Sequence, residues 1–406
     1  MSQRQQFPQP HLMSKETRDA QLARRVVAHA HRRPAPQVNR HRLWFLLGML
    51  VLFCMLSLAA LMQAGSRASR QTLVRQRQFA PLPALAAAGT FREYPFPRPD
   101  NEVMRPALDH QGRLWFGAMG QNALVVFDPR TQTFQYLTPP HGHHSIMGVL
   151  VAPDDTIWFA EQAANYLGHY DPVTRHYQLY SLPWLTVPDP GQPKYVQLLP
   201  SAPNELALDG HGDIWFTEFN ADRLGRLDPR TGSIRQYALS TKASVQTLYP
   251  YGVTIDRQGM VWFTESGTNQ LGRLDPSTGT YRVFATPDPH TLLMEVASDA
   301  RGAIWVTSFT PGILLRFTPG SGTFTSYLAP ADGRESSPFY GLLVTPTGDV
   351  WVTNLAENVL ARLDIAAQRL LSYHIPKPGS QPLGLVMDGS HALWFTGANA
   401  VGVLHP

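Results

Sequence analysis

The sequence predicts an all-β fold, a seven-bladed β-propeller over residues 90–406, preceded by one transmembrane helix. Three observations predict the propeller. A motif centred on tryptophan recurs seven times, each copy contains four short strand-like runs, and the last copy lacks a strand that the start of the domain supplies. Four strands repeated every 40–50 residues or so is typical of a propeller blade.

The N-terminal region holds the basic charge of this 406-residue chain, whose net charge is +4. Residues 1–42 contain nine Lys or Arg and two acids, and residues 67–77 add four arginines, so residues 78–406 carry a net charge of −7. A mildly acidic main domain argues against nucleic-acid binding.

Residues 43–62 form a run of twenty residues without a charge, which is long enough for a helix to cross a bilayer. We expect an uncleaved signal-anchor helix over 43–64, and the alternative is a cleaved signal peptide. The preceding positive charge predicts a single-pass protein of the cell membrane, with a cytoplasmic N-terminus and an extracytoplasmic propeller. Residues 1–42 are then a disordered basic tail and residues 65–89 a linker. The one cysteine, Cys54, falls within the predicted helix, so we expect no disulfide in the propeller.

The repeat has the same order of signals in each copy. A short apolar run is followed by a D-x-x-G turn, a run such as VWFT, a polar loop, LGRLDP and an alternating strand such as TYRVFA. Asp, Pro and Gly suit tight turns, and no copy has the 3.6-residue periodicity of a helix. The last copy ends after its third strand, and TFREYPFP at 90–97 has the form of the missing fourth, so we expect it to close the ring. The repeated tryptophans, spaced 43, 57, 47, 43, 46 and 43 residues apart, are Trp115, Trp158, Trp215, Trp262, Trp305, Trp351 and Trp394.

These motifs resemble the virginiamycin B lyase (streptogramin lyase) family of seven-bladed propellers. The resemblance covers residues 90–406 and rests on PYGVTIDRQGMVWFTE, GDIWFTEFNADRLGRLDP and EYPFP. It implies a lyase site with histidines in the last two blades, a nearby glutamate and a bound magnesium ion. Here Tyr340 and Leu383 stand where the histidines would be, and Gln381 where the glutamate would be. A leucine cannot move a proton and tyrosine is a poor base at neutral pH, so the same reaction by the same residues is not expected.

The start of each innermost strand is predicted to form the rim of the central channel. Most copies have glycine at the second rim position, but three have the charged residues Arg105, Glu205 and Glu295. These side chains either orient a polar ligand over an apolar floor or pair with one another and fill the channel. The expected ligand-binding residues of the rim are Arg105, Asn204, Glu205, Tyr251, Glu295, Phe339 and Tyr340.

Two loops on the same predicted face offer further candidates. The longest insertion, 183–203, carries Trp184 and is either a lid that contacts ligand or a proline-rich surface loop. The histidine run that includes His143 and His144 is a weak candidate for a metal site, because its spacing is not diagnostic.

The glutamates of WFTE recur as Glu161, Glu218 and Glu265 in three consecutive copies. Three carboxylates at one channel mouth are weak candidates for a cation site or for proton transfer. A structural hydrogen bond from one blade to the next, with Arg226 or Arg273 as the expected partner, is the favoured interpretation, because one role for three copies suits architecture better than catalysis. The candidate catalytic carboxylates are Glu218, Glu265 and Glu295.

Three functions remain open from the sequence. The first is a membrane-anchored module that binds a small molecule or a peptide on its loop face. The second is a C–O lyase that opens cyclic depsipeptides with relocated residues and Mg²⁺. The third is a metal-dependent lactonase or esterase. Whether the protein is an enzyme is undecided at this point.

Overall fold

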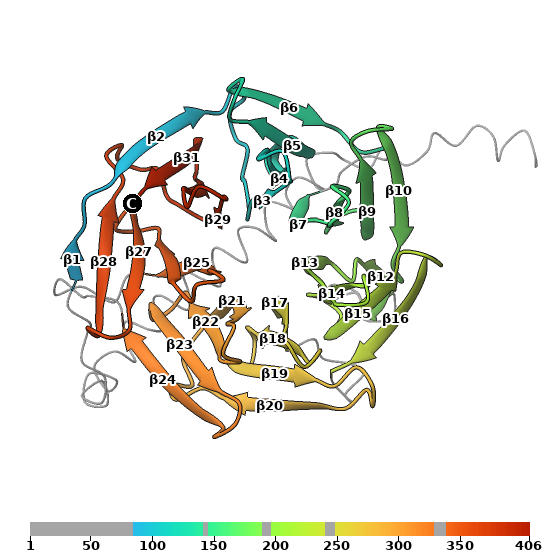
Figure 1. Cartoon of the computed structure of the whole chain (residues 1–406). Coiled ribbons are helices and arrows are strands. Elements are labelled where there is room, and N and C mark those ends of the chain that lie inside the picture. Colours follow the sequence, from blue (N-terminus) through green and yellow to red (C-terminus); the bar gives the residue numbers. More distant parts are fainter. Residues whose placement is uncertain (1–83, 141–144, 189–195, 240–247, 329–337) are drawn as a thin grey trace, which may run out of the picture. The chain divides into compact units, whose positions relative to one another are not determined.

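The computed structural model describes residues 84–140, 145–188, 196–239, 248–328 and 338–406, which lie within one compact unit, residues 79–406. In these ranges the chain forms seven antiparallel sheets of four strands around a central axis (Figure 1), and one of the sheets gains a fifth strand. The predicted all-β, seven-bladed propeller is confirmed. No helix of the described residues is long and apolar enough to cross a membrane. The predicted tail, 1–42, and anchor, 43–64, lie outside these ranges.

Each blade is a meander whose first strand lies at the channel and whose last lies at the outside. Blade 1 consists of β3 (Ala107–Leu108), β4 (Leu114–Ala118), β5 (Ala123–Asp128) and β6 (Thr133–Leu137). Blade 2 consists of β7 (Ile146–Val151), β8 (Ile157–Glu161), β9 (Tyr166–Asp171) and β10 (His176–Ser181). Blade 3 consists of β13 (Pro203–Leu208), β14 (Ile214–Glu218), β15 (Arg223–Asp228) and β16 (Ser233–Ala238). Blades 4 and 5 consist of β17 (Pro250–Ile255), β18 (Val261–Glu265), β19 (Gln270–Leu274) and β20 (Tyr281–Ala285); and β21 (Leu293–Ser298), β22 (Ile304–Ser308), β23 (Ile313–Thr318) and β24 (Thr323–Leu328). Blades 6 and 7 consist of β25 (Phe339–Val344), β26 (Val350–Asn354), β27 (Val359–Asp364) and β28 (Arg369–His374); and β29 (Leu385–Met387), β30 (Leu393–Thr396), β31 (Ala400–His405) and β2 (Thr90–Pro95). Outside the blades lie a 3-10 helix, Met119–Gln121, and a hairpin, β11 (Leu185–Pro188) with β12 (Val196–Leu199).

The ring is closed by the strand that the sequence predicted. β2 pairs antiparallel with β31 over six residues, so the first and last segments of the propeller lie side by side (Figure 1, blue beside red). A short strand ahead of it, β1 (Ala84–Ala86), pairs in parallel with β28 of blade 6. The N-terminal segment of the domain therefore extends one blade and completes the next, which covers edges that would otherwise be exposed.

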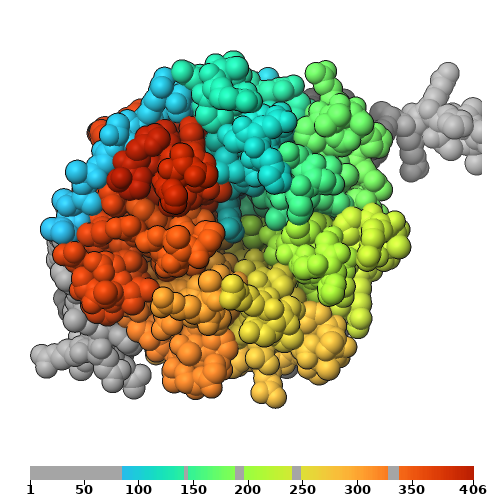
Figure 2. All heavy atoms as spheres, viewed as in Figure 1, coloured from blue at the N-terminus to red at the C-terminus, as the bar shows by residue number. Residues whose placement is uncertain are grey.

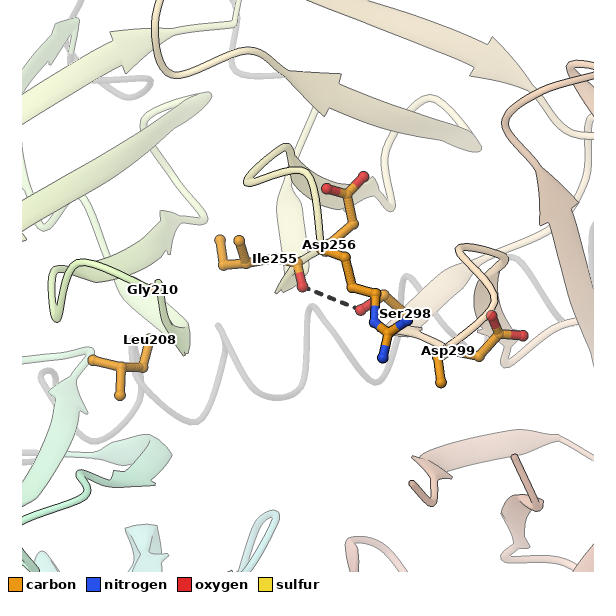
Figure 3. A pocket seen from close by; sticks show the side chains of 8 residues that line it. Leu208, Gly210, Ile255, Asp256, Ser298 and Asp299 are labelled. Carbon is orange, nitrogen blue, oxygen red and sulfur yellow. Dashed lines mark hydrogen bonds between the residues drawn. The ribbon is translucent and has the colours of Figure 1, made fainter. Parts of the chain in front are cut away.

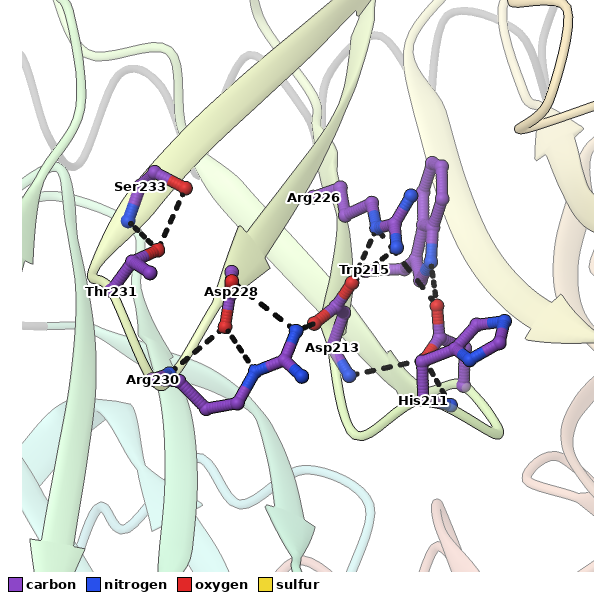
Figure 4. A network of polar contacts seen from close by, with 9 residues as sticks. His211, Asp213, Trp215, Arg226, Asp228, Arg230, Thr231 and Ser233 are labelled. Carbon is purple, nitrogen blue, oxygen red and sulfur yellow. Dashed lines mark hydrogen bonds and ion pairs between the residues drawn. The ribbon is translucent and has the colours of Figure 1, made fainter.

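The repeated tryptophan is held by the aspartate of the D-x-x-G turn. In blade 3 the Asp209 carboxylate accepts hydrogen bonds from the backbone N–H groups of His211 and Asp213 at 2.8 and 3.0 Å, and from Trp215 Nε1 at 2.9 Å (Figure 4). The guanidinium of Arg226 lies 5.6 Å from the ring centroid of Trp215 and pairs with Asp213. A buried indole N–H needs an acceptor, so this aspartate both fixes the turn and satisfies the core tryptophan.

Five blades share this arrangement. The pairs are Asp109 with Trp115, Asp209 with Trp215, Asp256 with Trp262, Asp299 with Trp305, and Asp388 with Trp394, at 2.7–3.0 Å. Blade 2 has Ala152 and blade 6 has Thr345 at the aspartate position. Among the described residues the Nε1 atom of Trp351 in blade 6 has no acceptor.

The threonine of the WFT run joins each of five blades to the next. Thr264 Oγ1 accepts a hydrogen bond from the backbone N–H of Gly252 at 2.9 Å and donates one to the carbonyl oxygen of Met294 at 2.7 Å. The second contact crosses from blade 4 to blade 5. The same pair of bonds is made by Thr217, Thr264, Thr307, Thr353 and Thr396, the last of which reaches Met104 of blade 1. Threonine, rather than glutamate, therefore makes the contact between blades.

The hydrophobic core lies between neighbouring blades. One cluster combines Trp262 and Leu271 of blade 4 with Leu293, Ile304 and Phe317 of blade 5, all at most 1% exposed. Each blade buries one face against the next, so the blades are stable only as a ring.

Candidate functional site

The inner strands begin with a bulge that defines the upper rim of the channel. In blade 4, Pro250 pairs with Glu265 and the next regular pair is Val253 with Phe263, so two residues lie between without a regular partner. The inner strand thus starts where the second strand ends, and we call this face of the ring the upper face. The same register shift occurs in blades 2 to 6. Figure 2 shows the ring in space-filling form, with a hollow where the inner strands meet.

Glycine at the second rim position is explained by the neighbouring blade. A Cβ atom on Gly341 would lie 2.0 Å from the carbonyl oxygen of Leu383, and one on Gly252 would lie 2.7 Å from that of Met294. A contact this close requires a shift of the backbone. Side chains at this position are therefore costly, and the three blades that carry one carry a charged residue.

The three charged rim residues meet on the axis. Arg105 Nη1 of blade 1 lies 3.7 Å from Glu205 Oε1 of blade 3 and 3.5 Å from Glu295 Oε2 of blade 5. The glutamates are 7% and 4% exposed, whereas the Arg105 side chain is 32% exposed. The guanidinium thus spans the channel above two buried carboxyl groups, and both ion pairs are long.

One arginine cannot neutralise two buried carboxylates. Burial, followed by the nearby Glu295 carboxylate, raises the pKa of Glu205 to about 8, although Arg105 opposes the shift. Burial likewise raises the pKa of Glu295, again against the effect of Arg105. The two carboxylates repel each other, and a pKa of about 8 keeps Glu205 protonated at neutral pH. With Glu295 ionised, the cluster of Arg105, Glu205 and Glu295 would be uncharged overall.

Two tyrosines from blades 4 and 6 lie beside this cluster. The hydroxyl groups of Tyr251 and Tyr340 are hydrogen-bonded to each other, and the two rings are at 81° to one another. Burial raises the pKa of both phenols, and the neighbouring Glu295 carboxylate adds to the shift. Both therefore stay neutral at physiological pH and line the upper end of the channel as aromatic walls with one shared hydroxyl contact. We call the space that they enclose with Arg105, Glu205 and Glu295 the chamber.

The aromatic lining continues onto the upper face. Phe219 has ring contacts with Tyr249 at 5.1 Å and with Tyr251 at 6.3 Å, and Phe309 contacts Tyr340 at 6.5 Å. Tyr249 is 36% exposed. The resulting arc of five rings runs over blades 3 to 6 and leads into the chamber, and we call it the aromatic arc.

Asn204 completes the described polar rim. Its Nδ2 donates to the carbonyl oxygen of Tyr251 at 3.3 Å, and its Oδ1 accepts from Gln162 Nε2 at 3.3 Å. At 2% exposure Asn204 positions the neighbouring rim residues, and little of its side chain is left for a ligand.

The WFTE glutamates are buried and do not join the chamber. Glu218 accepts two hydrogen bonds from Gln236 Nε2 of the outer strand, at 2.7 and 2.9 Å, and Glu265 accepts one from Thr268 at 2.6 Å. Burial raises the pKa of both. Glu161 is 0% exposed and lies near Tyr177.

The arginine partner expected for Glu218 is different in the structure. Arg226 pairs with Asp213 and stacks on Trp215 instead, because it lies on the sheet face opposite to Glu218. The glutamates therefore serve the scaffold within each blade.

The remaining candidates lie apart from the chamber. Phe339, predicted at the rim, is 1% exposed and packs in the core of blade 6 with Leu342 and Val352, because it pairs with the second strand just before the bulge. Trp184 is 48% exposed next to the β11–β12 hairpin. His143 and His144 lie outside the described residues.

The opposite mouth of the channel holds a shallow pocket of about 330 Å³ between the turns of blades 3, 4 and 5 (Figure 3). Its carboxylates are already used, since Asp256 and Asp299 bind the turn backbone and a tryptophan each. Ser298 donates to the carbonyl oxygen of Ile255 at 3.1 Å. This pocket therefore offers few free polar groups to a ligand.

Some residues of the site were missed from the sequence. Phe219 and Phe309 stand four residues after their repeat tryptophans, immediately after the second strand. The backbone N–H of each bonds to the loop that precedes the inner strand, at 2.9 and 2.8 Å, which places it at the rim. Aligning this position across the copies would have found them.

The channel does not fit the magnesium ion that the resemblance implies. The Arg105 guanidinium lies between the two carboxyl groups, where a metal ion would have to bind. In the described part of the chain, no three His, Cys, Asp or Glu side chains come together as a metal-binding group. Magnesium prefers several oxygen ligands in octahedral geometry, which this set does not offer.

Comparison with known proteins gives one family and several structures. Residues 242–405 match the family model for the virginiamycin B lyase family. A streptogramin B lyase structure is 23% identical with a TM-score of 0.68, over 78% of this chain and 97% of that one. The catalytically inactive virginiamycin B lyase from Staphylococcus aureus with quinupristin is 24% identical with a TM-score of 0.68, over 79% of this chain and 100% of that one. The extracellular domain of a hybrid two component system from B. thetaiotaomicron is 18% identical with a TM-score of 0.57, over 75% of this chain and 40% of that one. No curated protein matches the sequence.

The ring of seven blades, its closure strand and its axial cluster define a β-propeller with a chamber on the upper face. Blades 4 to 7 match the family model of the virginiamycin B lyases, and the ring is similar in fold to a streptogramin B lyase structure, the resemblance that its motifs indicated. At identities below 25%, the structural likeness carries the fold and leaves the activity to be argued from the site.

Proposed function

We propose that this protein is a membrane-anchored, extracytoplasmic propeller that binds a small molecule or a peptide at the upper channel mouth. The uncharged run at 43–62 and its preceding arginines support the anchor. The likeness to an extracellular propeller domain and to a lyase structure that contains quinupristin supports an exported domain with a ligand on its face.

The observation that carries the proposal is the convergence of Arg105, Glu205 and Glu295 from three blades beneath the aromatic arc. The other four blades have glycine at this position, where a Cβ atom would clash with the neighbouring blade, so the three charged residues stand out from the repeat. An apolar and aromatic mouth with a few convergent polar groups is the usual form of a ligand site.

Binding is tested with the full chain in detergent micelles, by equilibrium dialysis against cyclic depsipeptides and short peptides with detection by mass spectrometry. We expect retention of a ligand by the wild type and its loss in a Phe219→Ala, Phe309→Ala double variant. Val173→Ala, on the exposed turn of blade 2, is the matched control because its side chain is 91% exposed. Retention that is equal in all three proteins would place the ligand elsewhere and refute the proposed site.

A C–O lyase with relocated residues is the second candidate, and the carboxyl pair favours it. An elimination needs a base, an acid and a positive group beside the developing charge, and Glu295, Glu205 and Arg105 are of these types. In this scheme ionised Glu295 would take the proton next to a carbonyl and protonated Glu205 would supply one to the leaving oxygen.

Mass spectrometry separates the chemistries. Elimination opens a cyclic depsipeptide without a change of mass, whereas a lactonase or esterase adds one water. Mass-neutral opening that is lost in Glu295→Gln would support the lyase. A water adduct would support the hydrolase, and an unchanged but bound ligand supports the binding module.

A further inference from the structure

The ionisable groups of the chamber indicate the chemical class of its ligand. Five of the seven blades contribute a titratable group, namely Arg105, Glu205, Tyr251, Glu295 and Tyr340, and blades 2 and 7 contribute Met147 with Gly148 and Leu383 with Gly384. The phenols are neutral, so among the described rim residues the charges come from one guanidinium and two carboxyl groups. Full ionisation of the carboxyl groups would leave one uncompensated negative charge.

The second carboxyl group has no close cationic partner among the described residues. Glu205 is 7% exposed and accepts a hydrogen bond from the backbone N–H of Leu206. The cation that pairs with it is Arg105, whose Nη1 lies 3.7 Å from Oε1, too far for a hydrogen bond. A buried carboxylate in this position needs either a proton or a second cation.

The walls of the chamber suit a cation as well. Tyr251 and Tyr340 present aromatic rings beside the carboxyl pair, and Phe219 and Phe309 extend these rings to the upper face. Aromatic faces attract ammonium and guanidinium ions, most strongly where water is excluded. Aromatic walls above a carboxylate floor are a known way to recognise such groups.

We propose that the chamber binds an organic monocation, the ammonium or guanidinium group of a ligand, in exchange for the proton shared by Glu205 and Glu295. The proton leaves to solvent, both carboxylates become ionised, and two positive groups then face two negative ones. This inference rests on the proposed binding function, because it names the ligand class of the same site.

The exchange is tested by calorimetric titration of the full chain in detergent with n-butylammonium chloride. Titrations in two buffers of different ionisation enthalpy count the protons released. n-Butanol and potassium chloride serve as the uncharged and the inorganic counterparts. We expect about one proton released per bound ion, and affinity that rises about tenfold per pH unit until the pH reaches about 8 and then levels off.

Variants locate the exchange. Glu205→Gln and Glu295→Gln each remove one carboxylate, and we expect either to weaken butylammonium binding at least about tenfold, the effect of one lost charge pair in a dry site. Glu102→Gln removes a charge from an exposed position of the same face and should leave binding unchanged. Far-ultraviolet circular dichroism verifies that each variant is folded.

Butanol binding as tightly as butylammonium, binding without proton release, or proton release driven by magnesium instead would each overturn the inference. A depsipeptide or peptide retained at the aromatic arc without proton release would refute this ligand class alone and leave the proposed function intact. Failure of every ligand to bind would refute both.

Discussion

The residues at the lower end of the inner strand repeat from blade to blade, whereas those at the upper end vary. At the lower end, the turn aspartate and the tryptophan recur in five blades with nearly the same geometry, at 2.7–3.0 Å for the bond between them. At the upper end, the rim positions differ from blade to blade and carry the charges. Both ends belong to one repeat. The residues that recur at the lower end hold the ring together, and the residues that vary at the upper end give the rim its charges.

The residues that recur support the fold, whereas the charged residues that interrupt the glycine pattern at the rim belong to the proposed site. The WFTE glutamate recurs, and Glu218 and Glu265 accept hydrogen bonds from within their own blades, from Gln236 and Thr268. The charged rim residue occurs in three blades, and its copies meet across the channel. Substitutions at the two ends are therefore expected to change the free energy of unfolding to different extents.

Asp256→Ala should be the most damaging change at the lower end. It removes the acceptor of two backbone N–H groups and of Trp262 Nε1, at 2.9, 2.9 and 2.7 Å. Leaving a buried indole donor and the turn unsatisfied should cost about 3 kcal/mol in the free energy of unfolding, measured by urea denaturation. Asp275→Ala, at an exposed turn of the same blade, is the control and should have a much smaller effect. Equal losses at the two positions would remove the special role of the lower-end aspartate.

Thr264→Val should weaken the contact between blades 4 and 5. Valine has the shape of threonine but cannot accept the hydrogen bond from the backbone N–H of Gly252 or donate one to the carbonyl oxygen of Met294. We expect a loss of about 2 kcal/mol, together with faster hydrogen exchange at the start of β21. Thr278→Val, on an exposed turn, should be close to neutral. Unchanged exchange at β21 would show that the blades are held by their apolar faces alone.

Glu205→Gln should flatten the dependence of stability on pH. The pKa of Glu205 is about 8 in the folded protein against an ordinary value of 4.5, so the folded state binds more protons between these values and wild-type stability falls as the pH rises through this range. The slope is at most about 1.4 kcal/mol per pH unit.

Urea denaturation at several pH values measures this slope. Glutamine cannot titrate, so the variant should show a flatter profile and be the more stable protein near pH 8. Parallel profiles for variant and wild type would mean that Glu205 is not the group that holds the proton.

The sequence was sufficient for the scaffold because its signals are local. D-x-x-G, the tryptophan spacing and the EYPFP strand each specify a turn or a strand, and the structure has the seven blades and the β2–β31 closure that they predicted. Arg105, Glu205 and Glu295 could also be singled out, since they break a glycine pattern, and their mutual pairing was one of two open hypotheses.

The parts of the site that were missed depend on distances between blades. The contact between Tyr251 and Tyr340 joins residues 89 positions apart, and no local signal encodes it. Phe339 was misplaced because the bulge begins one residue later than the position alone suggested. Strand position predicts the end of the sheet at which a residue lies, but not the neighbour toward which its side chain turns, as Glu218 and Gln236 show.

Thr345→Asp should restore the aspartate of the repeat in blade 6. Blade 6 has Trp351 with an Nε1 atom that lacks an acceptor among the described residues, while Asp349 and Arg362 are already present, 3.5 Å apart. Blade 3 shows the complete set, in which Asp209 tolerates a neighbouring aspartate because an arginine lies between them. An aspartate at 345 should therefore accept the bond from Trp351 and add about 1 kcal/mol to the free energy of unfolding. Repeating the change in a Trp351→Phe background isolates this bond, and the gain should then disappear. A gain that survives without the indole would come from the turn alone, and the aspartate and the tryptophan would then be two separate features of the repeat rather than one unit.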